Sequence, residues 1–308
     1  MTPITRKAVQ PLIERALTED AASRDITSRA LLPPGARIRA AIIAKAPGVL
    51  AGGPLASWTF QTLDPRLRCV LKRRDGAPLA RGQVILVVEG RARSIFAAER
   101  TALNLLGHLS GIATLTREFV RRVPQRVAIL DTRKTLPGLR ALEKYAVRIG
   151  GGLNHRSNLS EAILIKTNHL KALRARSSPP RPASDESRGG QSIVHSPQLI
   201  QQAIARARRE KPRIFVEIEV TNLRELKAAL RAKPDAILLD NWSLLNVRRA
   251  VAVHDHGLWS MDYRPILEVS GSVTLANVRA IARTGVERIS IGRLTHSAPA
   301  LDVALKVL

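Results

Sequence analysis

After residue 125, short apolar segments alternate with segments of helical periodicity, and no other feature constrains the fold of this chain so strongly. The apolar segments are VAIL (127–130), AILI (162–165), IFVEIEV (214–220), AILLD (236–240), ILEVS (266–270) and RISIG (288–292). LRELKAALRA, LLNVRRAVAVHD and LANVRAIARTG, which separate the last four, have the period of amphipathic helices. Repeated strand–helix units predict a parallel sheet. Because polar residues end the strands, we expect a (β/α) barrel rather than an open sheet.

The chain before residue 110 follows a different pattern. Its β-branched segments at 36–45, 66–72 and 83–90 are separated by Gly and Pro, which predicts an α+β domain with a mostly antiparallel sheet. Residues 6–17 and 52–63 have helical patterns, whereas the Asp, Ser, Pro and Gly content of 17–35 predicts a loop. A long helix should run from Ser94 to about Val123, with Gly107 to Gly111 as a candidate break.

The net charge of +25 suggests nucleic-acid binding, but the rest of the composition does not favour it. Aromatic residues make up only 3% of the chain, too few for an evident stacking platform. Neither zinc-finger spacing nor a basic zipper pattern is present. Many arginines have the spacing of solvated helix residues, as in IARARREKPR (204–213). We therefore interpret most of the charge as solvated.

Cysteine usage and hydropathy bear on the compartment. Cys69 is the single cysteine, so intrachain disulfides are excluded and a reducing, cytoplasmic location is expected. The N-terminus lacks the apolar run of a signal peptide, and no stretch of about 18 apolar residues predicts a membrane span. Residues 172–192 are rich in Ser, Pro, Gly and Arg and predict a disordered surface insert, with an added partner or nucleic-acid contact as the alternative.

Cations cluster after two of the apolar segments. Arg133 and Lys134 follow VAIL, and Lys166 follows AILI. Between them, three glycines at 150–152 lead to His155 and Arg156, and His169 follows the second segment. In α/β folds the carboxyl ends of strands carry the binding groups. The sequence thus predicts an anion pocket for a ligand with several carboxylate or phosphate groups.

Acidic and small residues end the later strands. Glu219 and Asp240 would face the cations and suit a ribose diol or water-bridged Mg²⁺, although simple charge balance is an alternative. We expect only one of Glu217 and Glu219 to face the barrel interior. The segments Ser270-Gly271-Ser272 and Gly292-Arg293 follow the last two strands, where barrels often bind phosphate. These residues favour group transfer on a phosphorylated sugar over hydrolysis by a nucleophile.

Several segments, in order along nearly the whole chain, resemble the quinolinate phosphoribosyltransferase (nicotinate-nucleotide pyrophosphorylase) family. They are LTEDAASRDITSRALLP, SIFAAERTALNLLGHLSGIAT, DTRKTLPGLRALEKYAVRIGGGLNHR, LIKTNH, VEIEV, ILLDN, LEVSGS and SIGRLTHSAPALD. Thr167, Ser272 and Arg293 depart from the residues frequent there, and the insert at 172–192 is longer than usual.

The resemblance implies both a fold and a reaction. An N-terminal α+β open sandwich (1–110) would join an incomplete TIM-like α/β barrel (111–294), and residues from about 295 to 308 would pack back on the sandwich. The enzyme, a dimer or larger assembly, would join quinolinate to 5-phosphoribosyl 1-pyrophosphate with Mg²⁺. Nicotinate mononucleotide, pyrophosphate and CO₂ would leave, on the de novo route to NAD.

The resemblance also implies roles for particular residues. Arg133, His155, Arg156 and Lys166 would hold the two quinolinate carboxylates, and Arg100 would reach into a neighbouring subunit's site. Lys134, Glu219 and Asp240 would act on the phosphoribosyl pyrophosphate, the two acids also through the metal. Ser270, Gly271, Ser272 and Gly292 would surround the 5′-phosphate.

Two other functions remain open at this point. One is a relative of the same fold that serves molybdenum utilisation, against which Asn154-His155-Arg156 and Glu143-Lys144-Tyr145 argue. The other is a nucleic-acid-binding protein on the same scaffold, against which the complete set of pocket residues argues.

Overall fold

The structure, a computed structural model, describes residues 4–177, 196–256 and 263–308. Its chain folds into two compact units. The first consists of Met1–Val120, Lys134–Asn154 and Gly292–Leu308, and the second of Arg121–Arg133 and His155–Ile291. Residues 134–154, which we expected in the barrel domain, thus cluster with the N-terminal part of the chain.

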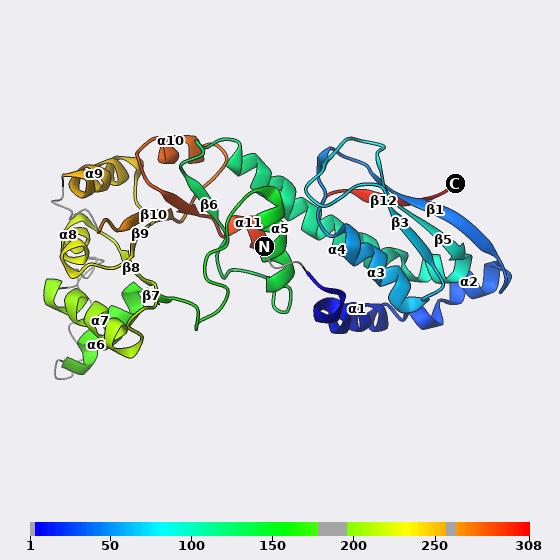
Figure 1. Cartoon of the computed structure of the whole chain (residues 1–308), viewed down its shortest axis with the longest axis horizontal. Helices are drawn as coiled ribbons and strands as arrows, with labels where there is room; N and C mark the ends of the chain where they lie inside the picture. Colours follow the sequence, from blue (N-terminus) through cyan, green and yellow to red (C-terminus); the bar gives the residue numbers. More distant parts are fainter. Residues whose placement is uncertain (1–3, 178–195, 257–262) are drawn as a thin grey trace, which may run out of the picture. The chain divides into compact units, whose positions relative to one another are not determined.

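The first unit is built on a four-stranded antiparallel sheet with the strand order β12-β1-β5-β3 (Figure 1). Its strands are β1 (Arg37–Ala44), β3 (Arg68–Leu71), β5 (Val84–Arg91) and β12 (Val303–Val307). The C-terminal strand β12 pairs with β1, with Ala40 opposite Val307 and Ala44 opposite Val303. A short ribbon joins β2 (Gly48–Val49) to β4 (Pro78–Leu79).

Helix α4 (Ala92–Val120) is the main helix of the first unit, and it is unbroken. The break that we considered near Gly107 to Gly111 was wrong. These glycines instead allow the C-terminal segment to lie close to the backbone of α4. The Leu301 N–H donates to the Gly107 carbonyl over 2.9 Å. A Cβ atom at position 111 would lie 2.0 Å from the Pro299 oxygen. The C-terminal segment therefore crosses α4 where the helix has no side chains.

The remaining helices of this unit pack mainly around α3 (Gly53–Leu63) and α4. They are α1 (Arg6–Glu19), α2 (Ile26–Leu31), α5 (Arg140–Gly150) and α11 (Arg293–His296), with a 3₁₀ turn at Ala22–Arg24. The loop expected over 17–35 was wrong in part, because α2 lies within it. Asp25 accepts a hydrogen bond from the Ser28 N–H and so caps α2.

The second unit contains a six-stranded parallel sheet with the order β6-β11-β10-β9-β8-β7 (Figure 1). Its strands are β6 (Ala128–Leu130), β7 (Ile163–Ile165), β8 (Val216–Val220), β9 (Ala236–Asp240), β10 (Ile266–Ser270) and β11 (Arg288–Ser290). Among the described strands, β6 and β7 are the two edges and do not pair with each other. The expected α/β class with an incomplete barrel is thereby confirmed.

Helices connect these strands, as the periodicity predicts. They are α6 (Thr167–Ser177), α7 (Pro197–Glu210), α8 (Leu223–Ala232), α9 (Leu244–Asp255) and α10 (Val278–Ala282). Residues 172–177 of the expected insert continue α6, and its remainder, 178–192, lies outside the described residues. In the described part of the chain, no helix is long and apolar enough to cross a membrane.

The strand register decides which side chains share a face of the parallel sheet. Glu217 is paired with Ala236, and Glu219 with Leu238. Residues two apart on a strand point to the same side, so both glutamates lie on one face. Our expectation that only one of them faces the barrel interior was wrong, because it treated a two-residue step as a change of face.

Candidate functional site

Three polar side chains end adjacent strands of the parallel sheet. Glu219 lies one residue before the end of β8, Asp240 ends β9, and Ser270 ends β10. Asp240 and Ser270 are directly paired in the register, and Glu219 is on the strand next to Asp240. Because the strands are parallel, the three residues occupy the carboxyl end of one sheet face, as the sequence predicts.

Glu219 is oriented by the beginning of α6. Its Oε1 atom accepts hydrogen bonds from the Thr167 hydroxyl over 2.7 Å and from the Thr167 N–H over 3.3 Å. Within the described residues, its Oε2 atom accepts no hydrogen bond from protein. Asp240 accepts a hydrogen bond of 3.1 Å from the Asn241 amide. Carboxylate oxygens held in this way suit Mg²⁺, which prefers oxygen ligands and usually takes only one or two protein carboxylates.

The turn after β10 depends on Asn241, a residue to which the sequence analysis gave no role. Gly271 and Ser272 have positive φ angles of 87° and 52°. The Asn241 N–H donates to the Ser270 carbonyl over 2.9 Å, and a Cβ atom on Gly271 would lie 2.1 Å from Asn241 Oδ1. Only glycine therefore fits at position 271. An asparagine directly after a strand-ending aspartate was the available signal, because asparagine tolerates the left-handed conformation that Asn241 adopts.

The charges of Arg133 and Glu217 both act on the guanidinium of Arg156. Burial lowers the pKa of Arg156, and the positive charge of Arg133 lowers it further, whereas Glu217 acts in the opposite direction. The Arg156 guanidinium donates to the Ala162 carbonyl over 2.8 Å. Two guanidinium groups in a partly buried setting would be stabilised by an anionic ligand.

His155 is engaged inside the protein through both ring nitrogens. Its Nε2 atom lies 2.8 Å from Glu217 Oε2, and its Nδ1 atom accepts the Arg156 N–H over 2.8 Å. The His155 N–H donates to Asp131 Oδ1 over 2.9 Å. An Nδ1 atom that accepts fixes the neutral tautomer with hydrogen on Nε2. Both ring nitrogens thus have a partner within the protein in this conformation.

Glu217 and Glu268 form a buried acidic pair beside this histidine. Their side chains are 1% and 0% exposed, and His155 Nε2 lies 3.7 Å from Glu268 Oε1. Burial raises the pKa of Glu268 to about 7, with a further contribution from the negative charge of Glu217. The three side chains also lie close enough to hold one metal ion.

Of the remaining expected site residues, Lys166 belongs to the second unit, and Lys134, Gly292 and Arg100 belong to the first. Lys166, just after β7, has an exposed side chain, and its N–H donates to His169 Nδ1 over 2.9 Å. In the first unit, the Lys134 carbonyl accepts a hydrogen bond of 2.6 Å from the Thr295 hydroxyl. A Cβ atom on Gly292 would lie 3.0 Å from Lys134 Cδ, so this glycine leaves room for the lysine. Arg100 is exposed on α4.

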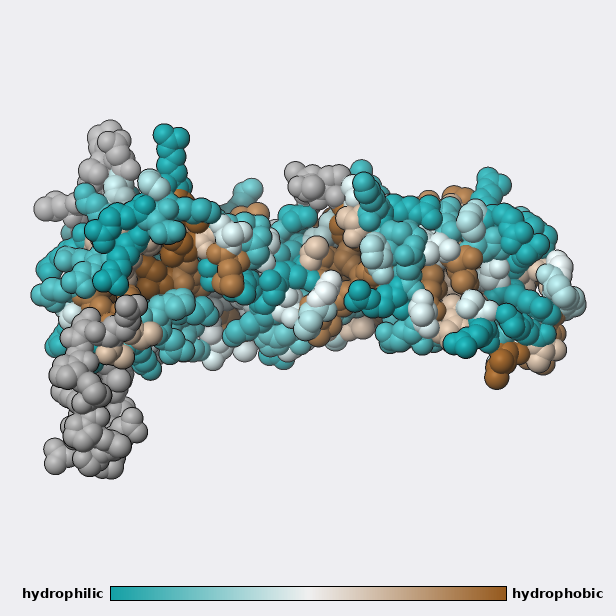
Figure 2. Space-filling model, turned by 90° about the horizontal axis from the view of Figure 1, so that it is seen from below, coloured by the Kyte–Doolittle hydropathy of each residue, from teal (hydrophilic) through white to brown (hydrophobic). Residues whose placement is uncertain are grey.

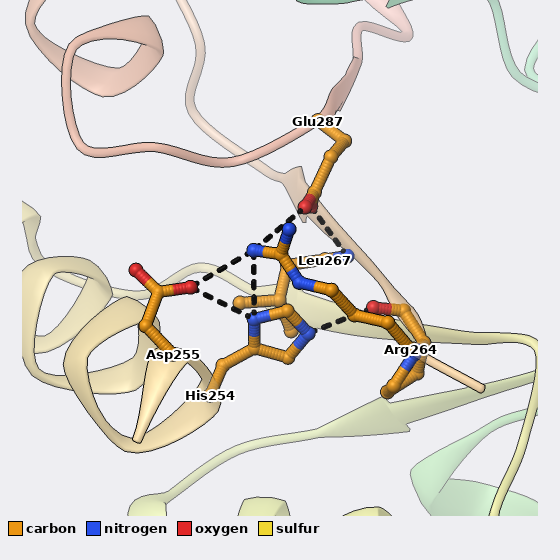
Figure 3. Close-up of polar contacts among 6 residues, drawn as sticks. His254, Asp255, Arg264, Leu267 and Glu287 are labelled. Atoms are coloured by element: carbon orange, nitrogen blue, oxygen red, sulfur yellow. Dashed lines mark hydrogen bonds and ion pairs between the residues drawn. The ribbon is translucent and has the colours of Figure 1, made fainter. Parts of the chain in front are cut away.

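A second polar network lies at the opposite end of the parallel sheet (Figure 3). His254 Nε2 lies 2.8 Å from the Pro265 carbonyl, and Arg264 contacts Asp255 over 2.9 Å. Glu287 accepts a hydrogen bond of 2.9 Å from the Leu267 N–H, just inside β10. Polar groups at the amino ends of barrel strands contribute to stability rather than chemistry, so we assign this network to the scaffold.

The fold and the site residues together define the class of protein. The protein is an α/β protein whose parallel sheet carries cations, carboxylates and a glycine turn in the segments that follow its strands. These groups match a ligand with several anionic substituents.

Comparison with known proteins identifies the family. Residues 25–110 match the N-terminal domain of quinolinate phosphoribosyl transferase, and residues 112–185 and 191–306 match its C-terminal domain. The nicotinate-nucleotide pyrophosphorylase [carboxylating] of Mycobacterium leprae is 38% identical over 97% of this chain and 96% of its own length. A solved nicotinate-nucleotide pyrophosphorylase structure from Francisella tularensis is 34% identical, with a TM-score of 0.84 over 99% of this chain and 98% of its own. The chain belongs to the quinolinate phosphoribosyltransferase family.

Proposed function

We propose that this enzyme transfers the phosphoribosyl group of 5-phosphoribosyl 1-pyrophosphate to quinolinate. Nicotinate mononucleotide, pyrophosphate and CO₂ are the products, and the reaction supplies NAD biosynthesis. The observation that carries the proposal is the match of both family domains, in order, along the chain. The paired arginines and the strand-end carboxylates support it, because they suit the acidic acceptor and the sugar donor respectively.

Quinolinate is a planar dicarboxylate and is bound by Arg133, Arg156 and Lys166, with His155 supporting them. Forked guanidinium groups bind carboxylates through two parallel hydrogen bonds. Burial, and after it the positive charge of Arg133, lowers the pKa of Arg156, and both effects favour a negatively charged ligand at this position. An incoming carboxylate places negative charge beside both guanidinium groups and so favours their charged forms.

The phosphoribosyl donor is handled by Lys134, Glu219 and Asp240. Loss of pyrophosphate leaves positive charge on the sugar, and the two carboxylates stabilise this charge and orient the ribose hydroxyls. Lys134 neutralises negative charge on the departing pyrophosphate. Asp240 and Glu219, whose Oε2 atom accepts no hydrogen bond from the described residues, would suit a Mg²⁺ ion that is bound mainly through substrate and water. When bound, this ion supplies charge neutralisation for the pyrophosphate.

The 5′-phosphate is bound by the turn Ser270-Gly271-Ser272 together with Gly292. The positive φ angles of Gly271 and Ser272 support this role, because consecutive residues of such a turn can present their N–H groups to an anion. Asn241 stabilises the turn from the neighbouring strand through its contacts with Ser270 and Ser272.

Decarboxylation uses the same cations as binding. When CO₂ leaves, electron density remains on the ring carbon next to the pyridine nitrogen. Positive charge from Arg133 and Arg156 stabilises the developing charge, and a proton from water then bonds to this carbon in place of CO₂. No covalent enzyme intermediate is required.

The active form is a homodimer or a larger assembly, in which Arg100 contributes to a neighbouring subunit's site. Its exposure on α4 supports this role. Ile26 and Leu31 on α2 are 80% and 75% exposed, and apolar surface is visible at this end of the first unit in Figure 2. Such surface is typical of a contact with another chain. The single free cysteine, Cys69, supports a cytoplasmic location.

A steady-state assay tests the function. Purified protein is mixed with quinolinate, phosphoribosyl pyrophosphate and Mg²⁺, and nicotinate mononucleotide and CO₂ are followed. We expect turnover that disappears with EDTA and falls at least about 100-fold in Lys134→Ala. Lys227→Ala, which removes an exposed lysine on α8, is the matched control and should retain activity. A folded protein without turnover contradicts the proposal and favours the molybdenum-linked or nucleic-acid-binding alternatives.

A further inference from the structure

Two buried carboxylates beside His155 are only partly satisfied. Glu217 Oε1 and both oxygens of Glu268 are buried and accept no hydrogen bond within the described residues. Glu217 Oε2 is hydrogen-bonded to His155 Nε2 over 2.8 Å, whereas the Ser290 hydroxyl faces Glu268 closely enough to lower its pKa somewhat but forms no hydrogen bond of ordinary geometry with it. Burying a carboxylate without a hydrogen-bond partner is unfavourable for folding. Such an arrangement points to a role other than stability.

The histidine connects this pair to the segments that carry the two arginines. Its Nδ1 atom accepts the N–H of Arg156, and its own N–H donates to Asp131. Asp131 is fully buried, directly follows β6 and lies two residues before Arg133. A chain of hydrogen bonds therefore runs from Glu217 through the imidazole to the backbone of Arg156. A second bond fixes His155 to the β6 end that leads to Arg133.

We propose that Glu217 and Glu268 are positioning residues for the carboxylate-binding part of the site. Glu217 holds His155 in the Nε2–H tautomer through its hydrogen bond, and Glu268, with Oε1 3.7 Å from Nε2, favours the same ring orientation by charge. The ring in turn fixes the backbone of Arg156. The glutamates touch no substrate and act through His155. The inference rests on the proposed function, since it names the ligand of Arg156 as quinolinate.

A metal ion bound by the three side chains is the competing explanation for their proximity. Two atoms of a tetrahedral zinc site, each about 2.0–2.1 Å from the ion, lie about 3.3 Å apart. The separation of 2.8 Å between His155 Nε2 and Glu217 Oε2 is that of a hydrogen bond. Arg156 and Arg288 already place positive charge near this pair. Geometry and charge thus favour the hydrogen-bonded arrangement.

The test combines ligand binding with the state of the imidazole. Glu217→Leu removes the acceptor of the His155 proton, and Glu217→Gln keeps an acceptor while removing the charge. Isothermal titration should show quinolinate affinity about tenfold weaker in Glu217→Leu, with substantial recovery in Glu217→Gln. The KM for phosphoribosyl pyrophosphate should stay within about twofold, because Glu217 does not serve that substrate. Tenfold corresponds to about 1.4 kcal/mol of binding free energy.

Nitrogen NMR of histidine-labelled protein supplies a readout that is independent of activity. The chain has 7 histidines, so a His155→Asn variant identifies the signal. We expect the Nε2–H tautomer in the unmodified protein and a tautomer mixture in Glu217→Leu. Glu225→Gln is the control, because Glu225 is equally buried and accepts hydrogen bonds from Thr221 instead. It should leave both affinity and the His155 signal unchanged.

The outcomes separate the two hypotheses. If the unmodified protein has the Nε2–H signal but binds no quinolinate, the proposed function fails. If it binds quinolinate and Glu217→Leu binds equally well, the positioning role is overturned. A folded Glu268→Gln variant should weaken quinolinate binding at least about threefold, and unchanged affinity would remove Glu268 from the role. Stoichiometric metal in the purified protein that is lost in Glu268→Gln would also overturn the proposal.

Discussion

Replacing Glu268 by glutamine should change how the stability of this protein depends on pH. The pKa of the Glu268 carboxyl rises from an ordinary 4.5 to about 7, first because of burial and then because of Glu217. The groups that face it from neighbouring elements, His155, Ser290 and Arg288, favour the charged form but do not outweigh burial. Glu268→Gln keeps nearly the same shape and cannot ionise.

The sign and size of the effect follow from proton linkage. Because the folded state holds the proton more tightly than the unfolded state, the stabilising contribution of protonated Glu268 is complete below pH 4.5. It is lost as the pH rises through about 7. At about 1.4 kcal/mol per pH unit of pKa difference, the loss is about 3 kcal/mol, without discount for solvent because the side chain is 0% exposed. Between pH 5 and pH 8, the unfolding free energy of Glu268→Gln should therefore rise relative to that of the unmodified protein.

Urea unfolding followed by circular dichroism at pH 5, 6, 7 and 8 measures this difference directly. From pH 5 to pH 8, the unfolding free energy of the unmodified protein should fall relative to that of Glu268→Gln by most of the expected loss of about 3 kcal/mol. Glu210→Gln on the exposed side of α7 is the control and should follow the unmodified protein at every pH. Parallel pH profiles for the unmodified protein and Glu268→Gln would refute the reasoning.

Two further substitutions test other features of the structure. Gly111→Ala should destabilise the protein by about 2 kcal/mol, because overpacking against the Pro299 carbonyl exceeds the gain of about 1 kcal/mol in helix propensity. Thermal and urea unfolding measure this, and Gly35→Ala, which has nothing within 4 Å of the new Cβ, should be nearly neutral. Arg133→Ala should weaken quinolinate binding at least about tenfold, as measured by titration calorimetry. Arg209→Ala, on the exposed side of α7, is the control and should leave binding unchanged. Equal, negligible effects of the two substitutions would remove Arg133 from the site.

The parallel sheet was predictable because its signal is local. A buried strand such as AILLD (236–240) is a short apolar run, and a polar residue marks its end. Once the strands are known to be parallel neighbours, it follows that Glu219, Asp240 and Ser270 lie together at the carboxyl end of the sheet. The resemblance to quinolinate phosphoribosyltransferases was also confirmed, because its motifs extend over both domains.

Features that depend on three-dimensional contacts were harder to predict. Arg208 resembles a solvated helix residue, yet it forms an ion pair of 2.7 Å with Asp235 and donates to the Ile214 carbonyl. Its partner Asp235 lies 27 positions further along the chain, and no helical spacing reveals it. The buried contact of His155 with Glu217 spans 62 positions. Pairings at such separations are set by the packing of the sheet, so one sequence gives no local sign of them.

The pairing of β12 with β1 bears on how the protein is made. About 200 residues separate the end of β5 from the start of β12. At about 5–20 residues per second, a ribosome needs on the order of 10–40 s to synthesise them. During that time one edge of the apolar strand β1 is without the partner that covers it in the finished protein. The nascent N-terminal sheet therefore exposes an unpaired strand edge, and it is completed only when the last strand emerges.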